Sequence, residues 1–102
     1  MKRTLETIYH EDENGSLVQL KVYLEEYRKG GTSITLADIE TGEPYATATV
    51  WVPGLEEDEV AIKNYSENQG ILDNLILHGI VYKPHRSVQN GFVDIPICKL
   101  KV

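Results

Sequence analysis

Apolar and polar residues alternate with a period of two along several short segments of the chain. In residues 17–27 every second position is apolar, at Val18, Leu20, Val22 and Leu24. Such a period places one set of side chains on each face of a β-strand. Residues 45–52 follow the same rule and are rich in aromatic and β-branched side chains, which favour strands. Here the apolar face is predicted to carry Ala46, Ala48, Val50 and Val52, and the opposite face to carry Tyr45, Thr47, Thr49 and Trp51.

Turn sequences separate these segments at short intervals, as in antiparallel β proteins. Asn14-Gly15 is typical of a hairpin turn. The other predicted turns are Lys29-Gly30-Gly31, Thr41-Gly42-Glu43-Pro44, Pro53-Gly54 and Gln89-Asn90-Gly91. They bound further predicted strands at residues 4–10, 32–39, 60–63, 80–82 and 92–100. Pro96 lacks a backbone donor, which predicts that the last strand lies at a sheet edge.

One segment has the period of a helix. Ser66 and Gln69 have the spacing of a capping box, in which a hydroxyl side chain and a later Gln cap the helix start. Apolar residues then recur at helical spacing, at Ile71, Leu72, Leu75 and Ile76. Gly79 is placed to end the helix in a Schellman motif, with Ile80 supplying its apolar contact.

These elements predict a single α+β domain over residues 1–102. Its antiparallel sheet would have six or seven strands, connected at first as a meander, and would pack on one α-helix inserted before the final hairpin. A small open barrel with the helix at one end is the alternative. Both arrangements bury Val18, Leu20, Val22, Leu24, Ile34, Leu36, Val50, Ile62, Leu72, Leu75 and Ile76.

Negative charge is concentrated in the middle of the chain. Between Asp38 and Asp73 nine carboxylates accompany one base, Lys63, so this stretch carries −8 while the whole chain carries −6. Such a surface repels phosphate backbones and attracts basic protein surfaces. We therefore predict a basic protein partner and no direct nucleic-acid binding. The basic residues near the chain end are interpreted as a solvated edge: Lys83, His85, Arg86, Lys99 and Lys101.

The sequence lacks the patterns of common catalytic and cofactor sites. It has no nucleophile elbow, P-loop or dinucleotide-binding fingerprint, and its three histidines share no metal-ligand spacing. Cys98, the only cysteine, is interpreted as a packing residue. We therefore expect no enzyme activity, no cofactor and no metal. A lone cysteine and the lack of a long apolar run favour a cytoplasmic protein that neither enters nor contacts a membrane.

The acidic middle contains the candidate partner-binding residues. We expect six carboxylates to form a row that resembles a nucleic-acid backbone and fits a basic groove: Glu40, Glu43, Glu56, Glu57, Asp58 and Glu59. Tyr45 and Trp51 would be aromatic anchors at its centre. The competing interpretation is that the charge only confers solubility. An alternative function is a small-ligand-binding or metal-dependent enzyme that uses the curved sheet face, and the oligomeric state stays open.

Residues 62–72 read Ile-Lys-Asn-Tyr-Ser-Glu-Asn-Gln-Gly-Ile-Leu, and Leu75-Ile76-x-x-Gly79-Ile80-Val81 follows. Over residues 45–82 the chain resembles an uncharacterised family of small proteins from conjugative and phage-type mobile elements of gut-type bacteria. In that family a strand precedes Tyr-Ser-Glu-Asn-x-Gly, which opens a helix that ends in Gly-Ile. The resemblance implies no activity and no catalytic residues. It implies a context in which small acidic proteins counter host defence, sometimes by mimicking nucleic-acid charge.

Overall fold

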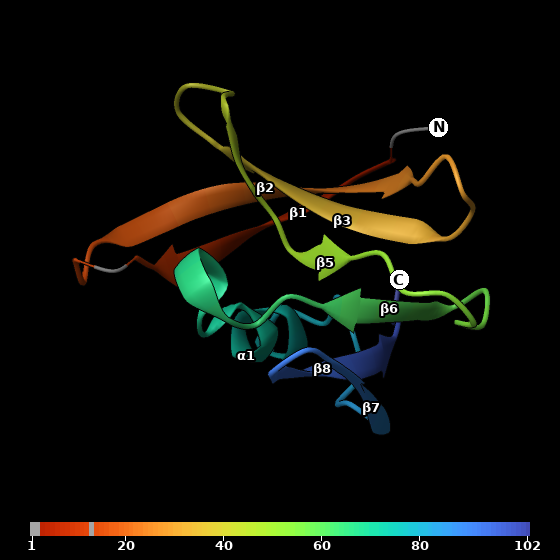
Figure 1. Ribbon diagram of the computed structural model, residues 1–102. Helices are drawn as coiled ribbons and strands as arrows, with labels where there is room; N and C mark the ends of the chain where they lie inside the picture. The colour runs from red at the N-terminus through yellow and green to blue at the C-terminus, as the bar shows by residue number, and fades with distance from the viewer. Residues whose placement is uncertain (1–2, 13) are drawn as a thin grey trace.

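The computed structural model describes residues 3–12 and 14–102, which form two four-stranded antiparallel sheets and one short α-helix (Figure 1). The first sheet has the order β1 (Arg3–Glu11), β2 (Leu17–Glu26), β3 (Thr32–Asp38), β4 (Pro44–Thr47). The second has the order β5 (Thr49–Val50), β6 (Glu59–Ile62), β8 (Val93–Lys99), β7 (Arg86–Asn90). A 3-10 turn, η1 (Ser66–Asn68), and the helix α1 (Ile71–Leu77) connect β6 to β7.

The predicted meander is confirmed in the first sheet, and the helix precedes the final hairpin as predicted. The prediction of a single sheet is wrong, because the predicted strand at residues 45–52 is broken at Ala48. Ala48 and Thr49 are both buried. In a continuous strand with one exposed face, two successive residues cannot both be buried, because their side chains point to opposite faces. The Ala48 N–H donates to Ile34 O in the first sheet, and Ala48 O accepts from the N–H of Lys63, which follows β6. The chain thus passes from one sheet to the other at Ala48, and neither sheet closes into a barrel.

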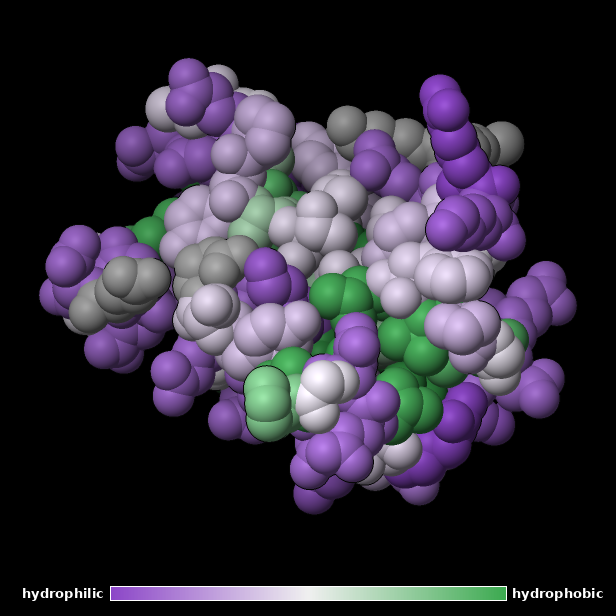
Figure 2. Space-filling model, viewed as in Figure 1, coloured by the Kyte–Doolittle hydropathy of each residue, from purple (hydrophilic) through white to green (hydrophobic). Residues whose placement is uncertain are grey.

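The main core lies between the two sheets and α1. It contains residues from β1, β2 and β3, from β6 and β8, and from the helix. Eight of the eleven predicted core residues are buried, whereas Val18, Val50 and Ile76 are only partly buried. A second, smaller cluster of Ala61, Ile95 and Ile97 covers the other face of the second sheet. Figure 2 shows apolar surface in this region, bordered by hydrophilic side chains.

The helix begins later than the capping-box pattern predicts. Gly70 precedes it with φ 91°, a left-handed conformation that separates α1 from the 3-10 turn of Ser66. Ser66 therefore lies inside the 3-10 turn and is not the N-cap of α1, which is Gly70. Instead the Oδ1 of Asn64 accepts from the N–H of Leu72 at 3.0 Å, which satisfies a donor of the first turn. Among the described residues no helix is long and apolar enough to cross a membrane.

The end of the helix is as predicted. Gly79 has φ 71°, its N–H donates to Ile76 O, and the N–H of Ile80 donates to Leu75 O. These two hydrogen bonds are those of a Schellman motif, and they satisfy carbonyl groups that the helix leaves open. Ile80 is fully buried, so the chain leaves the helix directly into the core.

The final hairpin differs from the prediction in two ways. The strand β8 lies between β6 and β7 and not at an edge. Pro96 is tolerated because the pairing with β6 ends at Ile97, so no partner is available for the missing N–H. Residues 86–90 form a strand that no apolar alternation indicates, whereas the predicted strand at residues 80–82 is only an isolated bridge between Val81 and Leu100.

Candidate functional site

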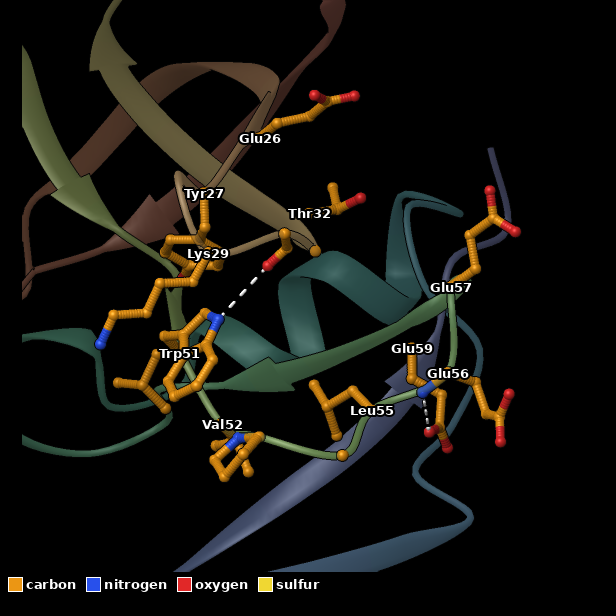
Figure 3. Close-up of a pocket in the computed structure, with 15 residues that line it drawn as sticks. Glu26, Tyr27, Lys29, Thr32, Trp51, Val52, Leu55, Glu56, Glu57 and Glu59 are labelled. Atoms are coloured by element: carbon orange, nitrogen blue, oxygen red, sulfur yellow. Dashed lines mark hydrogen bonds between the residues drawn. The ribbon is translucent and has the colours of Figure 1, made fainter.

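An open groove of about 420 Å³ lies where the turn between β2 and β3 meets the segment that follows β5 (Figure 3). We call it the Trp51 groove. The end of β2, the following turn and the first residue of β3 contribute residues 26, 27 and 29–32, and the chain from the end of β5 to the start of β6 contributes residues 50–57 and 59. The two segments are far apart in sequence, so the groove exists only in the folded protein.

A tight turn fixes the first wall of the groove. Gly30 and Gly31 have φ 91° and 95°, which glycine adopts without steric cost. The N–H of Tyr27 donates to Gly31 O at 2.9 Å, and the N–H of Gly30 donates to Tyr27 O at 3.0 Å. The indole N–H of Trp51 donates to Gly30 O at 3.3 Å, so this turn also holds the tryptophan ring in place.

The face of the Trp51 ring already contacts a cation. The Lys29 ammonium lies 4.7 Å from the ring centroid, within the range of a cation–π interaction. Trp51 is nevertheless 40% exposed, so part of the ring remains open to a partner. The prediction that Trp51 faces away from the core agrees with this position.

Tyr27 lines the groove, and a hydrogen bond with Thr49 fixes its position. The Tyr27 hydroxyl lies 2.7 Å from Thr49 Oγ1, which also accepts the N–H of Ile34 at 3.2 Å. Burial raises the pKa of Tyr27, and the hydrogen bond with Thr49 opposes this shift. The phenol therefore stays neutral and links the turn to the point where the chain changes sheets. The position of Tyr27 is thus fixed before any partner binds.

Carboxylates lie at the rim of the groove. Glu26, Glu56 and Glu57 are exposed, and none of the three forms an ion pair with another described residue. Figure 3 shows Trp51 and Lys29 on one side, Glu56 and Glu57 on the other, and Leu55 between them. The groove therefore combines an aromatic and apolar interior with an acidic rim, which suits a side chain with an apolar stem and a positive end.

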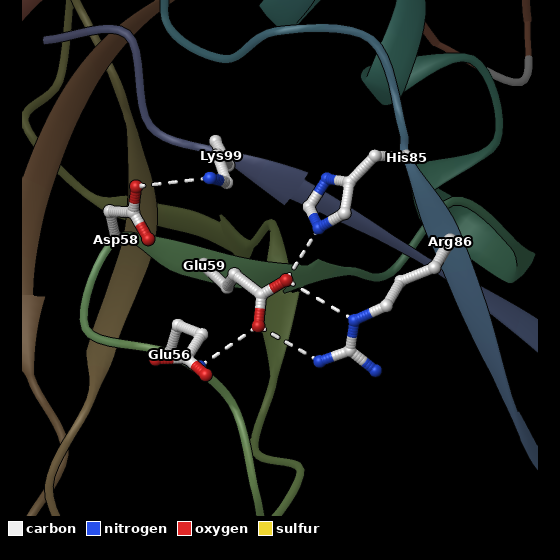
Figure 4. Close-up of polar contacts among 6 residues, drawn as sticks. All are labelled: Glu56, Asp58, Glu59, His85, Arg86 and Lys99. Carbon is white, nitrogen blue, oxygen red and sulfur yellow. Dashed lines mark hydrogen bonds and ion pairs between the residues drawn. The ribbon is translucent and has the colours of Figure 1, made fainter.

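Glu59 differs from the other acids because it is buried, at 4% exposure (Figure 4). Its Oε1 accepts from Arg86 Nη2 at 2.8 Å and from the Glu56 N–H at 2.9 Å. Its Oε2 accepts from Arg86 Nε at 3.2 Å and from His85 Nε2 at 2.5 Å. These contacts, with Arg86 as the largest cause, lower the pKa of Glu59 to about 2. Glu59 thus ties the acidic segment to β7.

The structure divides the predicted acidic row. Glu56 and Glu57 reach the Trp51 groove, whereas Glu59 is not on the surface. Asp58 is exposed and lies 3.9 Å from Lys99 Nζ. Glu40 and Glu43 lie beyond the far end of β3, about 20 Å from the groove at the usual rise of 3.3 Å for each strand residue. A continuous row of six carboxylates does not form.

Tyr45 is also placed differently from the prediction. It is half-buried, packs against the main core, and its ring centroid lies 6.3 Å from that of His10. It therefore does not flank Trp51 as a second anchor. The lining residues that sequence reasoning missed include Glu26, Tyr27 and Lys29. Their only signal is an acidic residue and an aromatic residue just before a Gly-Gly turn.

A second hollow, of about 620 Å³, lies between the end of β1 and α1. The Asn74 amide donates to Nδ1 of His10 at 3.0 Å, and desolvation lowers the pKa of this buried histidine. The His10 ring is thus neutral and serves to hold the helix against β1. We assign no ligand to this hollow.

Cys98 is fully buried, and burial raises the pKa of its thiol to about 11. Because the thiolate is the reactive form, we expect the native protein at pH 8 to resist a thiol reagent. The same protein in urea should react completely within the mixing time of the experiment. Labelling of the native protein as fast as of the unfolded protein would contradict the packing role of Cys98.

Among the described residues, no three His, Cys, Asp or Glu side chains converge in a way that would hold a metal ion. Comparison with protein-family models, with curated proteins and with solved structures finds no match to the chain. The proposal of a function therefore rests on the groove itself.

Proposed function

We propose that this protein is a non-enzymatic binding module whose Trp51 groove receives a basic surface of a partner protein. The observation that carries the proposal is a groove whose rim holds three carboxylates that form no ion pair with another described residue, and whose partly exposed tryptophan already contacts a cation. Aromatic residues at the centre of a contact contribute much of the binding energy of protein interfaces. Charges at the rim contribute steering and specificity.

The charge distribution supports this assignment. The net charge of −6 attracts a basic partner from a distance, and Glu40 and Glu43 add to that attraction from the far end of β3. Contact itself would occur at the groove, because its backbone and its tryptophan are already fixed by hydrogen bonds. Little conformational entropy is then lost on binding.

The resemblance to mobile-element proteins extends the proposal to a biological setting. We propose an accessory or anti-defence role in the bacterial cytoplasm, with a basic nucleic-acid-binding protein as the partner. Charge mimicry would then be limited to the groove end of the molecule. This extension rests on analogy of context, whereas the choice of a basic partner rests on the groove.

Affinity capture from a bacterial lysate tests the proposal with two matched double variants. Glu56→Lys with Glu57→Lys alters the groove, and Glu40→Lys with Glu43→Lys alters the far end. Each pair changes the net charge from −6 to −2, because each reversal adds two positive charges. General attraction should therefore weaken equally in both variants.

We expect the native form and the far-end variant to retain a basic protein that the groove variant loses. The amount of captured partner should decrease between about 50 and about 300 mM salt, since salt shortens the distance over which exposed charges attract one another. Equal recovery by all three forms would show that the acidic groove is not the binding site and that its charge only confers solubility.

A further inference from the structure

We propose that the group bound in the Trp51 groove is an arginine side chain of the partner, and that Lys29 competes with it for the face of Trp51. This inference rests on the proposed function and names the chemistry of its ligand. Its starting point is that the chain already places one of its own cations at the position where a partner's cation would bind.

Lys29 can leave the ring at small cost. It is exposed, it forms no ion pair with another described residue, and it lies in a turn closed by backbone hydrogen bonds alone. Trp51 keeps its own bond to Gly30 O when the lysine side chain rotates away. The ammonium therefore acts as an internal, replaceable ligand of the ring.

A guanidinium group fits the vacated position better than an ammonium. It is planar, it stacks on aromatic faces, and it is less strongly hydrated. Glu56 and Glu57 lie on the opposite side of the groove from the ring (Figure 3), where their negative charge attracts a guanidinium without contacting it. One arginine could thus stack on the tryptophan while the carboxylates of the acidic rim attract its charge from the other side of the groove, and a lysine stacks less well.

The experiment uses Trp51 as its own reporter, because it is the only tryptophan in the chain. A labelled peptide of alternating arginine and glycine is titrated into the full-length protein, with a lysine–glycine peptide as the comparison. Peptide anisotropy gives the affinity, and protein emission reports contact with the ring. The variants are Lys29→Gln and its charge-matched neighbour Arg28→Gln, which lies outside the groove lining.

We expect the arginine peptide to bind more tightly than the lysine peptide and to change the Trp51 emission. Lys29→Gln should bind it about two- to five-fold more tightly than Arg28→Gln, the effect of removing a competing cation–π contact at an exposed site. Equal affinities for the two variants would overturn the competition. Absence of peptide binding, or binding without a change in Trp51 emission, would overturn the arginine assignment. The proposed function is tested separately by the affinity capture, and loss of the captured partner in the groove variant would still support it.

Discussion

Replacing Leu75 by alanine is expected to lower the free energy of unfolding by about 2–5 kcal/mol, the usual range for a leucine truncated in a packed core. Leu75 is fully buried in the cluster that joins both sheets to α1. A helix of seven residues is not stable by itself, so its position depends on such contacts. Loss of the side chain removes packing and leaves a cavity between helix and sheets.

Leu77→Ala on the same helix is the matched control. Its side chain is 78% exposed, so the same chemical change should alter stability by no more than about 0.5 kcal/mol. Urea unfolding of the two variants, fitted with a common slope, measures the difference. Similar losses for Leu75 and Leu77 would show that the helix does not pack as the structure places it.

Neutralising Glu59 is the second change with a large expected effect. Glu59→Gln keeps the shape of the side chain but removes the charge that Arg86 and His85 contact. The variant should unfold at lower urea concentration at pH 7, because it loses charge-assisted hydrogen bonds at a buried position. Glu57→Gln, on the exposed rim, should leave the unfolding midpoint nearly unchanged and serves as the control.

The effect of Glu59 should depend on pH in a defined direction. Its pKa is about 2 in the folded protein and 4.5 ordinarily, so the ionised carboxylate stabilises the fold above that ordinary value. The advantage of the native protein over Glu59→Gln should shrink as the pH falls from about 5 toward 2. A difference that stays constant from pH 7 to pH 3 would contradict the ion pair with Arg86.

Sequence patterns predicted the parts of the fold that local interactions determine. The alternation in residues 17–27 specifies β2, and the turn glycines specify the first hairpins. Gly79 specifies the end of the helix, because few residues other than glycine adopt its left-handed conformation readily. In each of these cases the physical cause lies within a few residues of its effect.

The missed features depend on contacts between distant segments. The alternation in residues 45–52 continues through Ala48, and only the hydrogen bonds to Ile34 and Lys63 show that the strand changes sheets there. Likewise, Glu59 looks like its acidic neighbours in the sequence. Glu59 can be buried because Arg86, in β7, and the preceding residue, His85, contact its carboxylate. Both lie more than 25 positions away in the sequence.

The candidate site was predicted in part for the same reasons. Trp51, Glu56 and Glu57 could be chosen from residue type and charge. Their relation to Lys29 and Gly30 could not, because it arises from a contact across 21 residues. Glu40 and Glu43 are separated from the groove by the length of β3. The sequence alone does not show this separation, because it does not show that the groove lies at the other end of the strand.

The most direct test of the proposed function is the affinity of a basic decapeptide of arginine and lysine for the native protein and the two double variants. The groove variant and the far-end variant both carry −2, so any difference between them reports the site and not the total charge. We expect the far-end variant to bind nearly as well as the native protein, and the groove variant to bind at least about ten-fold more weakly, a loss of about 1.4 kcal/mol. Equal weakening in both variants would contradict the assignment of the Trp51 groove as the binding site.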